Sequence, residues 1–139
     1  MSKVAIVFWS QTGNTETMAN CIAEGAGANA TIIPCSEMNA AKLGEYDVVA
    51  FGCPAMGAEQ LEESEFEPMF SDLEGSLNGK KVAMFGSYGW GDGEWMRSWE
   101  SRCNGDGANL ACDSVICNEA PDDDVQAACR KLGADLAAW

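Results

Sequence analysis

A run of six small polar residues near the amino terminus, at positions 10–15, has the side chains to hold an anion. The run reads Ser10, Gln11, Thr12, Gly13, Asn14 and Thr15, follows an apolar segment directly and leads into a helical pattern. Its hydroxyls and amides lie where the free N–H groups and the positive dipole end of a helix converge. The run predicts a phosphate-binding loop that works without cations, because it contains no Lys or Arg.

Other interpretations of this run are weaker. The nucleoside triphosphatase motif GxxxxGK[ST] and the dinucleotide motif GxGxxG are both absent. Ser, Thr and Asn also cap helices routinely, but six consecutive small polar residues exceed what one cap requires.

The chain contains no His and seven Cys, at positions 21, 35, 53, 103, 112, 117 and 129. The absence of His excludes Ser-His-Asp triads and imidazole acid–base catalysis. No Cys-x-x-Cys pair is present, so the ligand spacing typical of zinc and iron–sulfur sites is missing as well. Several cysteines lie in apolar runs, which is typical of buried reduced thiols and favours a reducing compartment.

Length and charge limit the remaining classes of protein. A chain of 139 residues with 47% hydrophobic residues is expected to form one domain, spanning residues 1–139. Eight Lys and Arg stand against 22 Asp and Glu, and the net charge of −14 would repel nucleic acid and anionic membranes. No apolar stretch approaches the ~20 residues of a membrane span, and the amino terminus lacks a signal-peptide pattern. We therefore expect a cytoplasmic protein.

Apolar runs and helical periodicities alternate along the chain. Unbroken apolar runs at 4–9, 48–51 and 82–85 predict strands covered on both faces, with a shorter strand at 30–34 and a weaker one at 109–117. Helical spacing predicts helices around 18–25, 40–44, 66–73, 95–103 and 125–136. This alternation predicts an α/β fold, a doubly wound five-stranded parallel sheet of order 2-1-3-4-5 with helices on both faces.

Ligands of such sheets bind outside the carboxyl ends of the strands, at the switch point between the first and third strands. Three loops are expected to meet there, at 10–15, 54–59 and 87–93. A receiver domain would need acidic residues after the first strand, where Trp9 and Ser10 stand. A low-molecular-weight phosphatase would need Arg six residues after Cys53, where Glu59 stands. Both classes fit poorly.

The whole chain resembles the short-chain flavodoxins of clostridia and other anaerobes, which carry electrons on FMN. Three motifs in register carry the resemblance: the run at 10–15, the loop Cys53-Pro54-Ala55-Met56-Gly57, and the loop Gly86-Ser87-Tyr88-Gly89-Trp90-Gly91-Asp92-Gly93. The resemblance implies a flavodoxin-like fold and noncovalently bound FMN. The phosphate would lie in the first loop, and the isoalloxazine ring between the second and third loops.

The resemblance also implies roles for individual residues. Met56 would cover the inner face of the ring and Trp90 its outer face, tasks that suit a thioether and an indole. The Gly57 carbonyl would turn to accept a hydrogen bond from flavin N5 during reduction, and the Glu59 carboxylate would accept the N3 hydrogen. Asn118 resembles a position near the ribityl chain. The implied contacts also include Pro54, Ala55, Ala58, Ser87, Tyr88, Gly89, Gly91 and Asp92.

Acidic residues surround the expected ring edge. At about 10 Å and an effective dielectric constant of ~20, one carboxylate would oppose the extra negative charge of the fully reduced ring by ~1.7 kcal/mol before salt screening. The second reduction is therefore expected to be the low-potential step. The same charges would steer the basic docking faces of reductases and dehydrogenases.

We therefore expect a monomeric, low-potential one-electron carrier that shuttles electrons between oxidoreductases in place of ferredoxin and turns over no substrate of its own. One alternative is a flavoenzyme that reduces a small substrate with NAD(P)H, which would need a nicotinamide site. Another is a phosphate or nucleotide sensor that keeps the fold without the flavin. That alternative gives no reason for Met56 and Trp90 in opposing loops.

Overall fold

The computed structural model describes residues 2–11, 13–56, 60–89, 91, 93–110 and 112–139. Five parallel strands form one sheet of order β2-β1-β3-β4-β5, which confirms the predicted fold class and topology. The strands are β1 (Val4–Phe8), β2 (Ala30–Pro34), β3 (Val48–Gly52), β4 (Lys81–Tyr88) and β5 (Val115–Asn118). Val4 of β1 pairs with β2 on one side and with β3 on the other. The winding direction therefore switches between β1 and β3.

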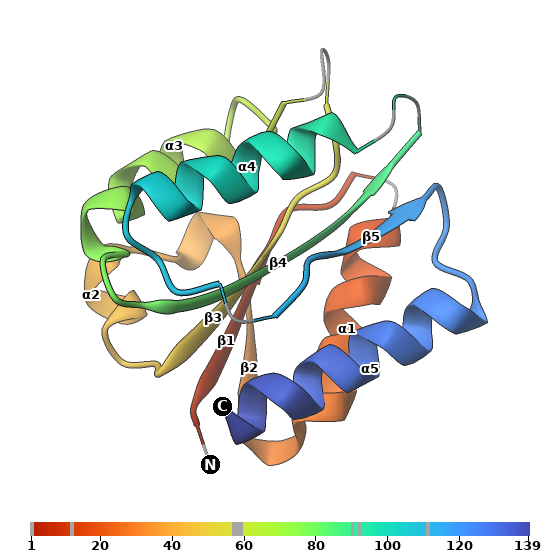
Figure 1. Ribbon diagram of the computed structural model, residues 1–139, viewed down its shortest axis with the longest axis horizontal. Coiled ribbons are helices and arrows are strands. Elements are labelled where there is room, and N and C mark those ends of the chain that lie inside the picture. The colour runs from red at the N-terminus through yellow and green to blue at the C-terminus, as the bar shows by residue number, and fades with distance from the viewer. Residues whose placement is uncertain (1, 12, 57–59, 90, 92, 111) are drawn as a thin grey trace.

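Helices cover both faces of this sheet. They are α1 (Asn14–Ala26), the single-turn α2 (Ala40–Leu43), α3 (Phe66–Leu73), α4 (Glu94–Gly105) and α5 (Asp123–Ala138). Figure 1 shows α3 and α4 on one side of the sheet and α1 and α5 on the other. Short 3-10 turns follow α1, β2 and α3. Within the described ranges, no helix combines the length and the apolarity that a membrane span requires.

Side chains along each strand alternate between two cores. Ala5 and Val7 of β1 face the layer of α3 and α4, whereas Val4 and Ile6 face the layer of α1 and α5. All four are fully buried. This two-sided burial explains why the strands have unbroken apolar sequences rather than alternating ones.

The fifth strand is shorter than the sequence predicts. The weak apolar run at 109–117 predicts one continuous strand, but β5 begins only at Val115. Asn109 makes an isolated bridge with Lys81, and the chain leaves the sheet before β5 begins. The polar interruption explains the break, because the Ser114 hydroxyl donates to the Glu100 carboxylate of α4 at 2.8 Å.

The cysteines are unpaired thiols, and all except Cys112 are buried. Burial raises the pKa of the Cys35 and Cys117 thiols to about 11. Burial likewise raises the pKa of Cys53, which directly follows β3 and begins the second loop. These thiols are therefore protonated and weakly nucleophilic at neutral pH.

Candidate functional site

A cleft of about 400 Å³ opens at the carboxyl end of the sheet. Residues from all three predicted loops line it, together with one residue from the segment after β5. The lining residues are Ser10, Gln11, Asn14, Thr15, Pro54, Ala55, Met56, Ser87, Tyr88, Gly89 and Glu119. The cleft therefore lies at the switch point where the topology predicts a ligand.

The first loop turns sharply into α1 at Gly13. Gly13 is the N-cap residue and adopts a left-handed conformation with φ of 94°, which a glycine reaches without strain. The Ser10 hydroxyl accepts a hydrogen bond from the Gly13 amide at 3.1 Å and holds the turn. The amides of Asn14 and Thr15 belong to the first helical turn and have no acceptor within the helix. They are suited to bind an anion at the positive end of the helix dipole.

Two buried hydroxyls join the first loop to the third. Thr15 is 1% exposed and Ser87 is 5% exposed, yet both line the cleft. Their oxygen atoms are 3.3 Å apart, within hydrogen-bonding distance. Each hydroxyl can make more than one hydrogen bond, so the pair can also serve a ligand.

The second loop forms an apolar wall of the cleft. The Ala55 amide donates to the Ser87 carbonyl at 3.0 Å, which fixes the start of this loop against β4. Met56 and Gln60 exchange two backbone hydrogen bonds of 2.8 and 2.9 Å, which close the loop on itself. Pro54, Ala55 and Met56 thereby present apolar atoms to the cleft.

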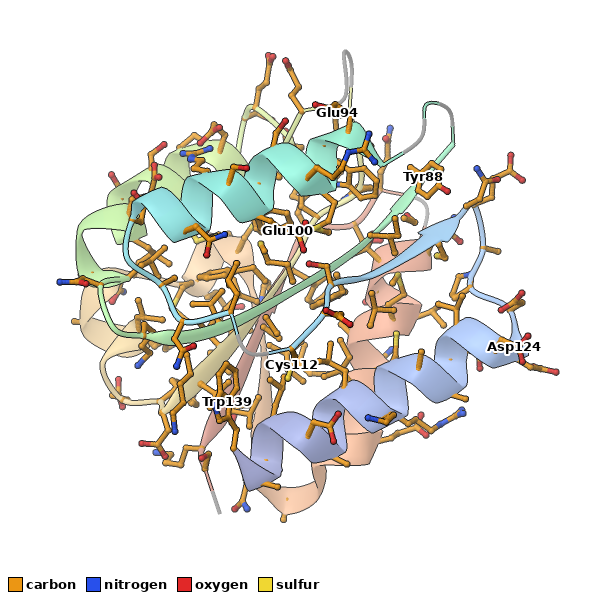
Figure 2. All side chains as sticks on the ribbon, in the orientation of Figure 1. Tyr88, Glu94, Glu100, Cys112, Asp124 and Trp139 are labelled. Atoms are coloured by element: carbon orange, nitrogen blue, oxygen red, sulfur yellow. The ribbon has the colours of Figure 1, made fainter. Side chains whose placement is uncertain are left out.

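The third loop leaves β4 at Tyr88. Figure 2 shows Tyr88 at the end of that strand, near the start of α4. Its ring contacts that of Trp95 with the centroids 5.4 Å apart. The Trp95 indole also donates from Nε1 to the Cys53 carbonyl at 3.1 Å. The start of α4 therefore holds the second and third loops together.

The structure gathers most of the described candidate residues. Ten of those predicted from the sequence line the cleft, and Gly13 shapes the turn beside them. Gly91 and Asn118 are described but do not line the cleft; Asn118 is the exposed last residue of β5. The remaining predicted residues lie outside the described part of the chain: Thr12, Gly57, Ala58, Glu59, Trp90 and Asp92.

Glu119 lines the cleft and was missed by the sequence reasoning. Its φ is 61°, the one positive value among the described non-glycine residues. The Glu119 amide donates to the Tyr88 carbonyl at 2.7 Å, and its carbonyl accepts from the Cys117 thiol at 3.4 Å. These contacts hold an uncommon backbone conformation. The available signal was its position, one residue beyond the carboxyl end of a strand.

No Lys or Arg stands among the described residues that line the cleft. The two arginines of α4 are engaged elsewhere, Arg97 in an ion pair with Glu94 and Arg102 in ion pairs with Glu67 and Glu74. Hydrogen bonds from Arg102 lower the pKa of both carboxyls. The Glu67 and Glu74 carboxyls therefore remain charged at neutral pH.

Known proteins have the same fold and a similar sequence. The flavodoxin family model matches residues 6–133. The flavodoxin of Megasphaera elsdenii is 47% identical over 133 residues, which cover 94% of this chain and 95% of that protein. That of Clostridium beijerinckii is 47% identical over 135 residues, with coverage of 95% and 97%. The solution structure of the two-electron reduced M. elsdenii protein has a TM-score of 0.89 at 46% identity, covering 98% of this chain and 99% of the other.

The cleft fits FMN, the cofactor of that family. Its volume lies within the range of small-molecule sites. The uncharged donors at the start of α1 suit a phosphate, and the thioether of Met56 and the ring of Tyr88 suit a flat aromatic group. With this fit and identity along nearly the whole sequence, the chain belongs to the flavodoxin family of FMN-binding electron carriers.

Proposed function

We infer that this flavodoxin is a low-potential one-electron carrier, which takes the place of ferredoxin between oxidoreductases. The observation that carries this inference is the character of the cleft. Its described lining offers uncharged donors and apolar walls, and it contains no nucleophile paired with a base. FMN supplies the redox chemistry when bound, accepting electrons one or two at a time. The protein binds this group and sets its potential, and it turns over no substrate of its own.

The phosphate of FMN would bind at the first loop. The amides of Asn14 and Thr15 would donate to it, together with the hydroxyls of Ser10, Thr15 and Ser87. Gln11, Thr12 and Gly13 complete this loop. Neutral donors leave the negative charge of the phosphate in place.

The ring would lie between the second and third loops. Met56 and Trp90 would cover its two faces, with Tyr88 and the glycines at 89 and 91 close by. Pro54, Ala55, Gly57, Ala58, Glu59, Ser87 and Asp92 would complete its surroundings, and Asn118 would lie near the ribityl chain.

Fixed negative charge would lower the potential of the second electron. The segment that leads from the second loop into α3 carries four acidic residues: Glu62, Glu63, Glu65 and Glu67. Hydrogen bonds hold the pKa of Glu62 at about 2, against the opposing effect of its burial. Glu62 therefore stays charged at neutral pH, and its carboxylate opposes any further negative charge placed beside it.

The same charges define the partners. A net charge of −14 favours association with basic docking faces of reductases and dehydrogenases, at rates that fall as salt rises. Residues 1–139 would form a single, monomeric domain. The reduced thiols suit a cytoplasmic location.

Potentiometric titration of the purified, FMN-loaded protein tests this proposal. We expect electrons to enter in two separate one-electron stages, with the second at the more negative potential. NADH alone should leave the protein oxidised. Direct two-electron reduction by NADH would contradict the carrier and favour a flavoenzyme. A protein that refuses FMN would contradict both and favour a phosphate or nucleotide sensor.

A further inference from the structure

Glu62 places a carboxylate inside the protein, where only 6% of the residue is exposed. The carboxylate accepts hydrogen bonds from the amides of Ser64, Glu65 and Phe66 at 2.8, 2.7 and 3.0 Å. The Ser64 hydroxyl donates to it as well. Burial would raise the pKa of Glu62, but these four donors outweigh it and hold the pKa at about 2. The group therefore carries a full charge that cannot move or titrate near neutral pH.

The main chain of Glu62 is tied to the beginning of the second loop. Its amide donates to the Cys53 sulfur at 3.4 Å. Cys53 in turn donates its amide to the Phe85 carbonyl at 3.2 Å and accepts from Trp95 Nε1 at 3.1 Å. One residue thus links the start of α3, the end of β3 and the first turn of α4.

Met56 separates Glu62 from the cleft. Met56 lines the cleft and also a second hollow of about 340 Å³, whose other lining residues are Gln60, Glu62, Glu63 and Ser64. The paired hydrogen bonds between Met56 and Gln60 close the loop two residues before Glu62. Glu62 and Ser64 therefore line a hollow whose other wall is Met56, the residue that also faces the cleft.

A simple helix cap would not need this arrangement. Glu65 is the N-cap residue of α3, and its side chain makes no capping hydrogen bond. The capping carboxylate comes instead from Glu62, three residues earlier, within the segment that returns from the second loop. Glu62 consequently both caps α3 and belongs to the end of the second loop.

We propose that Glu62 is a positioning residue for the cofactor, which fixes the second loop to α3 so that Met56 is held against the ring of FMN. This inference rests on the proposed function. It assigns to Glu62 an effect on FMN affinity and on potential, beyond an effect on the stability of α3. The immobile charge of Glu62 adds a constant field behind the ring.

The test compares Glu62→Gln with Glu65→Gln in the FMN-loaded protein. Both variants remove one negative charge from the same segment, but only the first replaces a buried acceptor oxygen with an NH₂ group that cannot accept from the surrounding donors. We expect Glu62→Gln to weaken FMN binding by about tenfold or more, because buried amides lose a charged partner. Glu65→Gln should bind FMN as the unchanged protein does. Both should raise the potential of the second electron, and Glu62→Gln should raise it further.

Ser64→Ala keeps the inference falsifiable if Glu62→Gln fails to fold. It removes one donor to the Glu62 carboxylate, and it should weaken FMN binding in the same direction by less. Equal affinities and equal potential shifts in Glu62→Gln and Glu65→Gln would overturn the inference and leave Glu62 as a cap. Failure of the unchanged protein to bind FMN would overturn the proposed function itself, and this inference with it.

Discussion

Helices α1 and α5 approach each other backbone to backbone, whereas α3 and α4 interlock through aromatic rings. A Cβ atom at Gly25 would lie 1.8 Å from the carbonyl oxygen of Arg130, and one at Gly133 would lie 2.0 Å from that of Ile22. Each helix therefore uses a glycine to admit the backbone of the other. This layer has no room for larger side chains at the contact.

The layer of α3 and α4 is built from large side chains. Phe66 and Phe70 meet Trp99 edge to face, with ring centroids 5.5 and 5.7 Å apart. The Arg102 guanidinium lies over the Phe70 ring, 4.9 Å from its centroid, and donates hydrogen bonds to Glu67 and Glu74. Aromatic contacts and ion pairs, rather than a close approach of the backbones, therefore join α3 to α4.

The two layers carry different loops of the cleft. The first loop leads into α1, so the proposed phosphate site lies on the tightly packed layer. The second and third loops lead into α3 and α4, so the proposed ring site lies on the layer that carries aromatic and charged contacts. Changes in one layer should therefore affect phosphate binding, and changes in the other should affect the ring.

Trp99→Ala should give the largest loss of stability in the aromatic layer. The side chain is 2% exposed, and its removal should cost about 3–5 kcal/mol in the free energy of unfolding. Its Nε1 has no acceptor among the described residues, so Trp99→Phe should cost far less. Urea denaturation of the two variants measures the difference. Equal losses would show that the ring contacts of Trp99 contribute little.

Gly25→Ala should break the other layer through crowding rather than through a cavity. The added methyl group meets backbone, which cannot rotate away, so the cost should reach about 3 kcal/mol. Gly105→Ala in α4 is the matched control, because nothing lies within 4 Å of its added Cβ. Thermal melting compares the pair. A Gly25→Ala variant as stable as Gly105→Ala would contradict the close approach of α1 and α5.

Asp106→Asn should produce the smallest effect, confined to the aromatic layer and dependent on pH. The neighbouring Glu74 carboxyl and partial burial raise the pKa of Asp106 from 3.8 to about 6. Between these values the folded state binds more protons than the unfolded state, so this group removes stability as pH rises from about 4 to 6. Asp106→Asn should be more stable than the unchanged protein at pH 7.5, and the gain should vanish near pH 4. A gain that is equal at both pH values would exclude the carboxyl pair as its cause.

Regular elements were predictable where apolar residues run or repeat without interruption, as in β3 and β4, whose positions 48–51 and 82–85 are all buried. The ranges 30–34 and 66–73 match β2 and α3 because apolar periodicity there continues to the element ends. At 109–117 the polar residues Asp113 and Ser114 leave the choice to tertiary contacts, and β5 is shorter as a result. The three loops of the cleft followed from strand order alone.

Contacts between distant segments were beyond sequence reasoning. Nothing in the local pattern indicates that the Glu62 carboxylate turns inward, or that Cys53 joins it to Trp95. Glu119 enters the cleft through a left-handed backbone that its residue type does not favour. Such features arise from packing between elements, which periodicity does not record.

Titration of the apoprotein with FMN and with riboflavin, at low and at high sodium chloride, tests the central claim most directly. Charge-assisted hydrogen bonds from uncharged donors should make FMN bind about 100-fold tighter than riboflavin. Because the cleft has no cation in its described lining and the protein carries a charge of −14, salt should leave the affinity for FMN unchanged or raise it. Equal affinity for riboflavin, or an affinity for FMN that falls steeply with salt, would contradict a phosphate held by neutral donors at the start of α1.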